Sequence, residues 1–135
     1  MPSKLVLALL VMAAACTPRG DRPNPELMQQ GRQYTAWLYS NDYNKLWDRF
    51  TPEMRQTFGS VGDLASFASL AVKHLGAEQG KVDERVNEAK PFHVYTRSAS
   101  FNKSRHRMLI EWSLANDGAV TGLVVRPATA DSTRQ

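Results

Sequence analysis

The sequence has a single cysteine and no long apolar run. One cysteine cannot close a disulfide within the chain, so the fold does not depend on a disulfide framework. The apolar run from Leu5 to Met12, about a dozen residues with the alanines after it, is shorter than the roughly 20 residues that span a bilayer as a helix. The 42% apolar content is enough for one domain with its own core. These features predict a single globular domain and no transmembrane anchor.

Catalytic and metal-binding motifs are also missing. The sequence contains no Gly-x-Ser-x-Gly, Ser-x-x-Lys or His-Glu-x-x-His motif and no glycine-rich phosphate loop. Its three histidines, His74, His93 and His106, are far apart in the chain and show no His-x-His spacing. We therefore assign no catalytic residue from a motif, and we expect no metal site and no cofactor.

The chain has a mild excess of positive charge. Lysine and arginine number 17 against 13 aspartates and glutamates, a formal charge of +4. The densest basic run, Lys103, Arg105, His106 and Arg107, has the character of a turn. Because nucleic-acid-binding domains usually collect their basic residues on one face or element, we expect no nucleic-acid partner.

The N-terminus has the pattern of an export signal. Met1 to Lys4 form a short basic start, Leu5 to Met12 are apolar, and three alanines lead to Cys16. The alanines and the cysteine resemble a bacterial lipobox, although position 13 holds Ala where lipoboxes most often have Leu. The resemblance implies that residues 1–15 are a lipoprotein signal peptide and that Cys16 receives the lipid, palmitate included. Two or three acyl chains hold a domain stably on a membrane.

The same pattern leaves two other interpretations open: an ordinary secretory signal with an incidental free cysteine, or an apolar segment that is not cleaved. Under the lipoprotein interpretation the domain is in the cell envelope, attached to a membrane through the lipid. Thr17 stands where an Asp retention signal would be, which favours the periplasmic face of the outer membrane.

The remaining chain divides into a tether, a domain and a tail. Residues 16–24 are polar and contain proline, so they form an extended tether, and residues 128–135 form a polar tail that we expect to be disordered. Between them, the domain at 25–127 begins with helices. Asn24 and Pro25 mark the start of a helix to about Tyr39, with Leu27, Gly31, Tyr34 and Leu38 on one stripe. Two short helices follow, and a fourth runs from Leu64 through Leu75 to Gly76.

Near Gly80 the spacing of the apolar residues changes from the helical period to the alternation typical of strands. Weak alternation around Val82, Glu84 and Val86 precedes a clearer strand from Phe92 to Phe101. Met108 to Leu114 alternates most strongly, and Asn116-Asp117-Gly118 supplies a hairpin turn before a return strand that ends at Pro127. Short turns between consecutive strands make the sheet antiparallel. We expect an α+β domain with N-terminal helices packed on a curved sheet of about four strands.

Four segments carry a family resemblance. Tyr95 to Phe101, Leu109 to Leu114 and Asp117 to Pro127, together with the helical stretch Asn41 to Glu53, resemble a branch of the nuclear transport factor two superfamily, which has a cone-like fold. This branch is the small domain of unknown function found alone or ahead of serine beta-lactamase-like hydrolases in bacterial envelope proteins. The resemblance covers about residues 26–127 and implies the fold better than the function.

Some branches of that superfamily are isomerases or dehydratases with an acid or base in an apolar pocket. The possible pocket residues here are His93, Tyr95 and Arg97 on one face of the second strand and Glu111 on the third. The alternative arrangement puts these four on the solvated side, with Phe92, Val94, Met108, Ile110 and Trp112 in the core. We expect a non-catalytic envelope domain that binds a protein partner or a cell-wall-related ligand; a small enzyme using His93 or Glu111 is the alternative.

Overall fold

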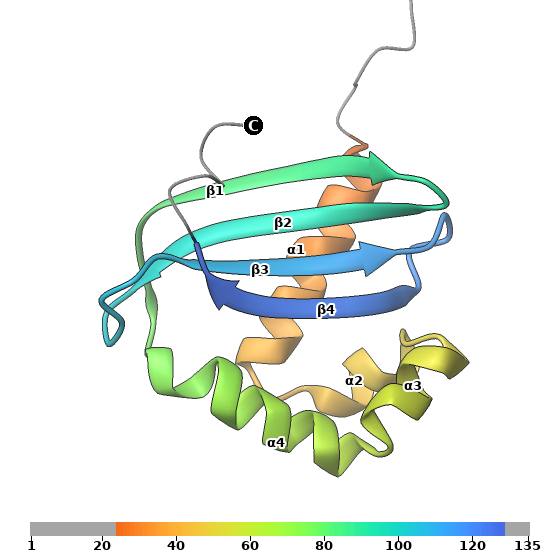
Figure 1. Ribbon diagram of the computed structural model, residues 1–135, viewed down its shortest axis with the longest axis horizontal. Coiled ribbons are helices and arrows are strands. Elements are labelled where there is room, and N and C mark those ends of the chain that lie inside the picture. The colour runs from red at the N-terminus through yellow and green to blue at the C-terminus, as the bar shows by residue number, and fades with distance from the viewer. Residues whose placement is uncertain (1–23, 129–135) are drawn as a thin grey trace, which may run out of the picture.

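The computed structural model describes residues 24–128, which form helices followed by a four-stranded antiparallel sheet. Figure 1 shows α1 crossing behind the strands, while α2, α3 and α4 line the lower side of the sheet. The α+β class and the order of helices before strands are as the sequence predicts. The expected signal peptide, Cys16, nearly all of the tether and all but the first residue of the tail lie outside the described residues.

Helix α1 spans Pro25–Tyr39, the bounds that its sequence predicts. The Asn24 side chain accepts hydrogen bonds from the N–H groups of Glu26 and Leu27, and so satisfies donors that an uncapped helix would leave free. The predicted stripe of Leu27, Gly31, Tyr34 and Leu38 is buried. This face packs against the sheet.

Three shorter helices follow: α2 Tyr43–Asp48, α3 Pro52–Phe58 and α4 Val61–Ala71. Thr51 caps α3 and Ser60 caps α4 through their hydroxyls. The prediction of one helix through Leu75 is wrong, because the backbone leaves α-helical geometry at Val72 (φ −127°) and continues as the short 3-10 helix η1, Lys73–Leu75. Gly76, with φ +80°, ends η1.

The strands are β1 Glu78–Ala89, β2 Phe92–Phe101, β3 Met108–Leu114 and β4 Val120–Pro127, arranged in sequence order. The bounds of β2 and β3 are those predicted. β1 is longer than its weak alternation indicates, because an irregularity between Gln79 and Asp83 breaks the period where Gly80 has φ +71°. At the start of β4, Val120 also forms a parallel bridge with Phe50, which joins the helical layer to the sheet.

The core lies between the helices and one face of the sheet. At its centre Trp112 is fully buried, and its indole N–H donates to the Thr35 hydroxyl of α1 over 3.0 Å. Tyr34 packs beside it, with ring centroids 5.7 Å apart. Among the described residues, the members of the core cluster fall between Leu27 and Val125.

Candidate functional site

The register of the sheet decides where the predicted pocket residues lie. Tyr95 pairs with Trp112 and Arg97 pairs with Ile110, so these residues share the face that is turned to the helices. Glu111 pairs with Thr96 on the opposite face, which we call the outer face. The structure therefore brings Tyr95 and Arg97 together and separates Glu111 from them.

Neither of the two arrangements expected from the sequence is correct. Met108, Ile110 and Trp112 are in the core as the second arrangement states, but so is Tyr95. Phe92 and Val94, which that arrangement placed in the core, point to the outer face, where Phe92 is 40% exposed. Alternation indicates which residues of one strand share a face. It does not indicate which face of that strand lies beside which face of the next strand, because this depends on the register.

Tyr95 lies directly beneath α1, at a glycine. A Cβ atom on Gly31 would lie 2.2 Å from Cγ of the Tyr95 ring, so only glycine allows the helix to approach this closely. The ring is fully buried, and its hydroxyl donates a 2.5 Å hydrogen bond to Oε2 of Glu84. The contact fixes α1 over β2 and directs the phenol toward β1.

A bidentate ion pair forms next to Tyr95. Arg97 on β2 donates from Nε to Oε1 of Glu78 over 2.8 Å and from Nη2 to Oε2 over 2.6 Å. The Tyr39 hydroxyl at the end of α1 donates to the same Oε1 over 2.7 Å. Glu78 therefore links the first residue of β1 to α1 and to β2, and its side chain is only 18% exposed.

Glu84 is the second acceptor of this cluster. Beyond the bond from Tyr95, its carboxylate accepts from Nε of Arg32 on α1 at 2.9 and 3.1 Å, and Nη1 of Arg97 lies 3.3 Å away. We call this cluster the helix-side network. Its members are Arg32, Tyr39, Glu78, Glu84, Tyr95 and Arg97.

The pKa values of the network follow from its contacts. Burial alone would raise the pKa of Glu78, but hydrogen bonds from Arg97 and Tyr39 bring the net value below the ordinary one. The pKa of Glu84 is also below its ordinary value. Burial alone would raise it, but hydrogen bonds from Arg32 and Tyr95 lower it. Burial and the bonds to these carboxylates raise the pKa of both tyrosines, and the bond to Glu78 raises that of Arg97.

These shifts limit what the network does chemically. A general acid or base works best with a pKa near the operating pH. The carboxylates are held ionised and the tyrosines are held protonated, so all four move away from neutrality. The arrangement fastens α1 to β1 and β2.

His93 and His74 stand apart from the network. Nε2 of the partly buried His93 lies 3.0 Å from Oδ1 of exposed Asn116 in the β3–β4 connection. His74 is exposed in η1, close to the C-terminal end of α4. Glu111 pairs with Arg126 on the outer face, with Nη2 and Oε1 3.4 Å apart.

The outer face is polar and carries two exposed apolar side chains. Arg107 extends across β2, donating to Oγ of Ser98 over 2.7 Å and to Oδ2 of Asp83 over 2.8 Å. Phe92 and Val124, 40% and 46% exposed, add apolar surface. In Figure 1 this face is turned to the viewer, and no helix of the described chain crosses it.

Four members of the helix-side network are not predicted as site residues from the sequence. Arg32 and Tyr39 come from α1, and Glu78 precedes the alternation from which β1 was predicted. Only Glu84 carried a signal, because it occupies an apolar position between Val82 and Val86. A carboxylate in such a position indicates a partner across the sheet or on a helix.

Within residues 24–128, no group of three or more His, Cys, Asp or Glu side chains is arranged to hold a metal ion. No helix in the same range is long and apolar enough to cross a membrane. Comparison of the chain with protein-family models, with curated proteins and with solved structures finds no match.

Proposed function

We propose that this protein is a lipid-anchored, non-catalytic domain of the cell envelope that binds a protein partner or a cell-wall ligand through the outer face of its sheet. The anchor is inferred from the N-terminal signal pattern and Cys16. The succession of helices and a four-stranded antiparallel sheet supports a nuclear transport factor two-like fold for residues 25–127.

The observation that carries the binding proposal is the uncovered outer face. All four strands contribute to it, and no helix of residues 24–128 packs on it (Figure 1). It combines ion pairs, hydroxyl groups and the exposed apolar side chains of Phe92 and Val124. Non-obligate protein interfaces have a comparable mixture of apolar and polar surface.

The isomerase or dehydratase alternative has less support. It requires His93 or Glu111 in a desolvated pocket. His93 is partly buried at the end of β2 and lies beside exposed Asn116, and Glu111 is on the outer face paired with Arg126. The buried titratable groups are instead those of the helix-side network, whose pKa values lie away from neutrality.

The test is an affinity capture from envelope extract. Residues 17–135 serve as the bait, since they include every helix, strand and core residue of the described chain. Val124→Glu places a charge on the outer face, and Leu70→Glu is its matched control, because Leu70 is an equally apolar side chain, 80% exposed on α4.

We expect a specific envelope protein or wall fragment to be captured by the parent and by Leu70→Glu, and to be lost with Val124→Glu. Equal capture by both variants would remove the outer face from the proposal. If nothing specific is captured, the binding function itself is contradicted.

A further inference from the structure

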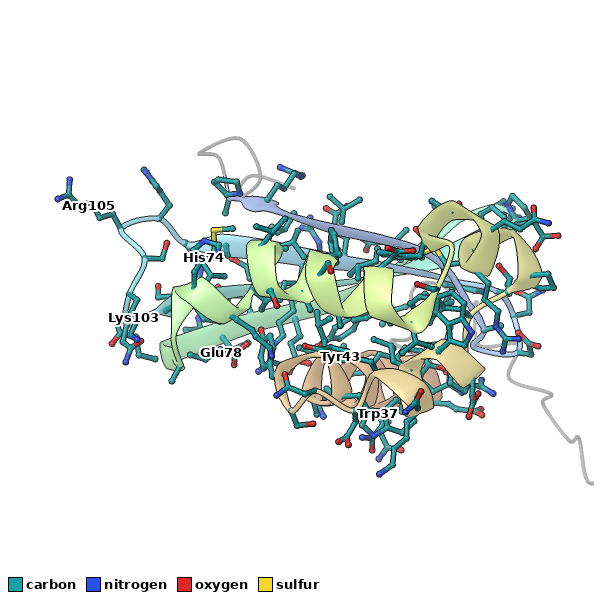
Figure 2. All side chains as sticks on the ribbon, turned by 90° about the horizontal axis from the view of Figure 1, so that it is seen from below. Trp37, Tyr43, His74, Glu78, Lys103 and Arg105 are labelled. Atoms are coloured by element: carbon teal, nitrogen blue, oxygen red, sulfur yellow. The ribbon has the colours of Figure 1, made fainter. Side chains whose placement is uncertain are left out.

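One end of the molecule collects exposed basic side chains from two segments. Lys73 and His74 come from η1, and Lys103, Arg105 and His106 come from the connection between β2 and β3; all five are exposed. We call these five residues the basic end. Figure 2 shows His74, Lys103 and Arg105 at the same end of the molecule, with Arg105 projecting furthest from its body.

Backbone contacts hold the two segments together. The N–H of Lys103 donates to the carbonyl of Leu75 and that of Asn102 to the carbonyl of Ala77, each over 2.9 Å. The Asn102 side chain accepts from the N–H of Ala77 over 3.0 Å. In the sequence the basic residues of the β2–β3 connection form a run on their own. In the structure these hydrogen bonds hold a second basic segment, η1, beside them.

No carboxylate neutralises this surface. None of its five residues forms an ion pair within residues 24–128; Lys73 instead lies over the Tyr43 ring, with Nζ 5.7 Å from the centroid. The nearby acids are engaged elsewhere. Asp83 contacts Arg107 and Lys81, and Glu78 is held by Arg97.

The other end of the sheet carries exposed acids. Glu88 precedes the β1–β2 turn, Asp117 is in the β3–β4 turn, and Glu26 is in the first turn of α1. In an antiparallel meander these turns lie opposite the β2–β3 connection. At that end Lys90 pairs with Glu88, with Nζ and Oε1 3.8 Å apart, so its charges are partly balanced, whereas the five residues of the basic end have no carboxylate partner in the described chain. An anionic surface therefore attracts the basic end more strongly.

We propose that the basic end docks onto the phosphate groups of an anionic phospholipid surface. Lys103 and Arg105 extend from the β2–β3 connection beside His74 of η1 (Figure 2), so cationic side chains of one loop can reach neighbouring phosphates of a surface. The choice of a membrane over another polyanion rests on the lipid anchor of the proposed function, which keeps the domain beside a bilayer. Each Lys or Arg that reaches such a surface contributes about fivefold to binding.

The experiment is co-sedimentation of residues 17–135, which lack the lipid, with vesicles at low salt. Vesicles of equal parts phosphatidylglycerol and phosphatidylcholine are compared with pure phosphatidylcholine. We expect sedimentation only with the anionic vesicles, its loss at high salt, and a roughly tenfold or greater drop for Lys103→Glu/Arg105→Glu. Lys103→Gln/Arg105→Gln should give a smaller drop in the same direction.

Lys90→Glu is the matched control for Lys103→Glu, because both lysines are exposed and flank the same strand, β2, at opposite ends. It should leave binding within about twofold of the parent. The proposal is overturned if the parent does not sediment with anionic vesicles, if Lys90→Glu and Lys103→Glu weaken binding equally, or if duplex DNA is bound more tightly than the vesicles. Because no lipid anchor is present, none of these outcomes depends on whether Cys16 is acylated.

Discussion

At the scale of single residues, the unusual feature is a set of ionised groups at positions where alternation would place apolar side chains. Glu84 and Arg97 face α1 together with buried Tyr95. They are tolerated because each is paired and hydrogen-bonded, and removing one partner leaves an uncompensated charge. Within this network, replacing Arg97 should affect stability most, since Arg97 contacts both carboxylates.

Arg97→Gln should lower the free energy of unfolding by about 2–3 kcal/mol at neutral pH, less than for a fully buried pair because the Arg97 side chain is 17% exposed. Arg126→Gln breaks the exposed pair with Glu111 and should cost less than about 1 kcal/mol. Urea unfolding of both variants measures the difference. Equal losses would show that the helix-side network contributes no special stability.

The network also predicts how stability depends on pH. Both glutamates have a lowered pKa in the folded state, so their contribution is complete above the unfolded value of about 4.3 and is lost as pH falls through the folded values. Acid should therefore destabilise the parent more steeply than Arg97→Gln, in which the folded pKa of Glu78 rises toward its ordinary value. Unfolding curves between neutral pH and acid check this, and parallel profiles would contradict it.

Gly31 gives a residue-scale test of the helix approach. Gly31→Ala gains helix propensity, but its Cβ would lie 2.2 Å from the Tyr95 ring, so we expect a net loss of about 1–3 kcal/mol. Gly62→Ala in α4, whose nearest neighbour is 3.6 Å away, should stabilise by up to about 1 kcal/mol. Thermal unfolding of the two variants should shift in opposite directions.

At the scale of elements, α1 is attached to the sheet by three different kinds of contact. Gly31 allows close approach over β2, the helix-side network adds ion pairs toward β1, and Thr35 joins α1 to β3. The hydroxyl of Thr35 donates to the carbonyl of Gly31 over 2.8 Å while accepting from the Trp112 indole. It is a buried polar contact between α1 and β3.

Thr35→Val keeps the shape of the side chain but leaves the buried Trp112 N–H without its acceptor, so we expect a loss of about 1–3 kcal/mol. Thr35→Ser retains the hydroxyl and loses only a methyl group, at a cost of about 1 kcal/mol. Denaturant unfolding followed by tryptophan fluorescence compares them. A larger loss for the serine variant would mean that packing at this position outweighs the hydrogen bond.

At the scale of the whole molecule, three surfaces have separate roles. The helices bury one face of the sheet, the outer face is left for the proposed partner, and the basic end is left for the proposed membrane contact. The proposed lipid anchor connects these proposals, because it would place the domain beside a membrane and envelope molecules.

The anchor has a direct test. In a bacterial cell that lipidates exported cysteines, the full chain should incorporate a clickable palmitate analogue and fractionate with membranes. After a high-salt wash, which also releases contacts made by the basic end, Cys16→Ser should have lost the label and left the membrane fraction, whereas Val124→Glu should keep both properties. Persistent membrane association of an unlabelled Cys16→Ser chain would indicate an uncleaved apolar segment instead of a lipid.

Local sequence patterns predict the order of the elements and the bounds of α1, β2 and β3. Asn24 with Pro25 starts α1, and the alternation of β2 and β3 gives their ends, because capping and side-chain period are local properties. The α4 end was misjudged, since the backbone change at Val72 has no strong breaker beside it.

Local sequence patterns do not predict which strand faces and which distant segments contact one another in the folded domain. Register puts Tyr95 beside Trp112 and leaves Glu111 on the opposite face, and packing of α1 adds Arg32 and Tyr39 to carboxylates far along the chain. The same holds for the basic end, where Lys73 and Lys103 become neighbours through contacts between η1 and the β2–β3 connection. These arrangements depend on strand pairing and helix approach, which one-dimensional periodicity does not encode.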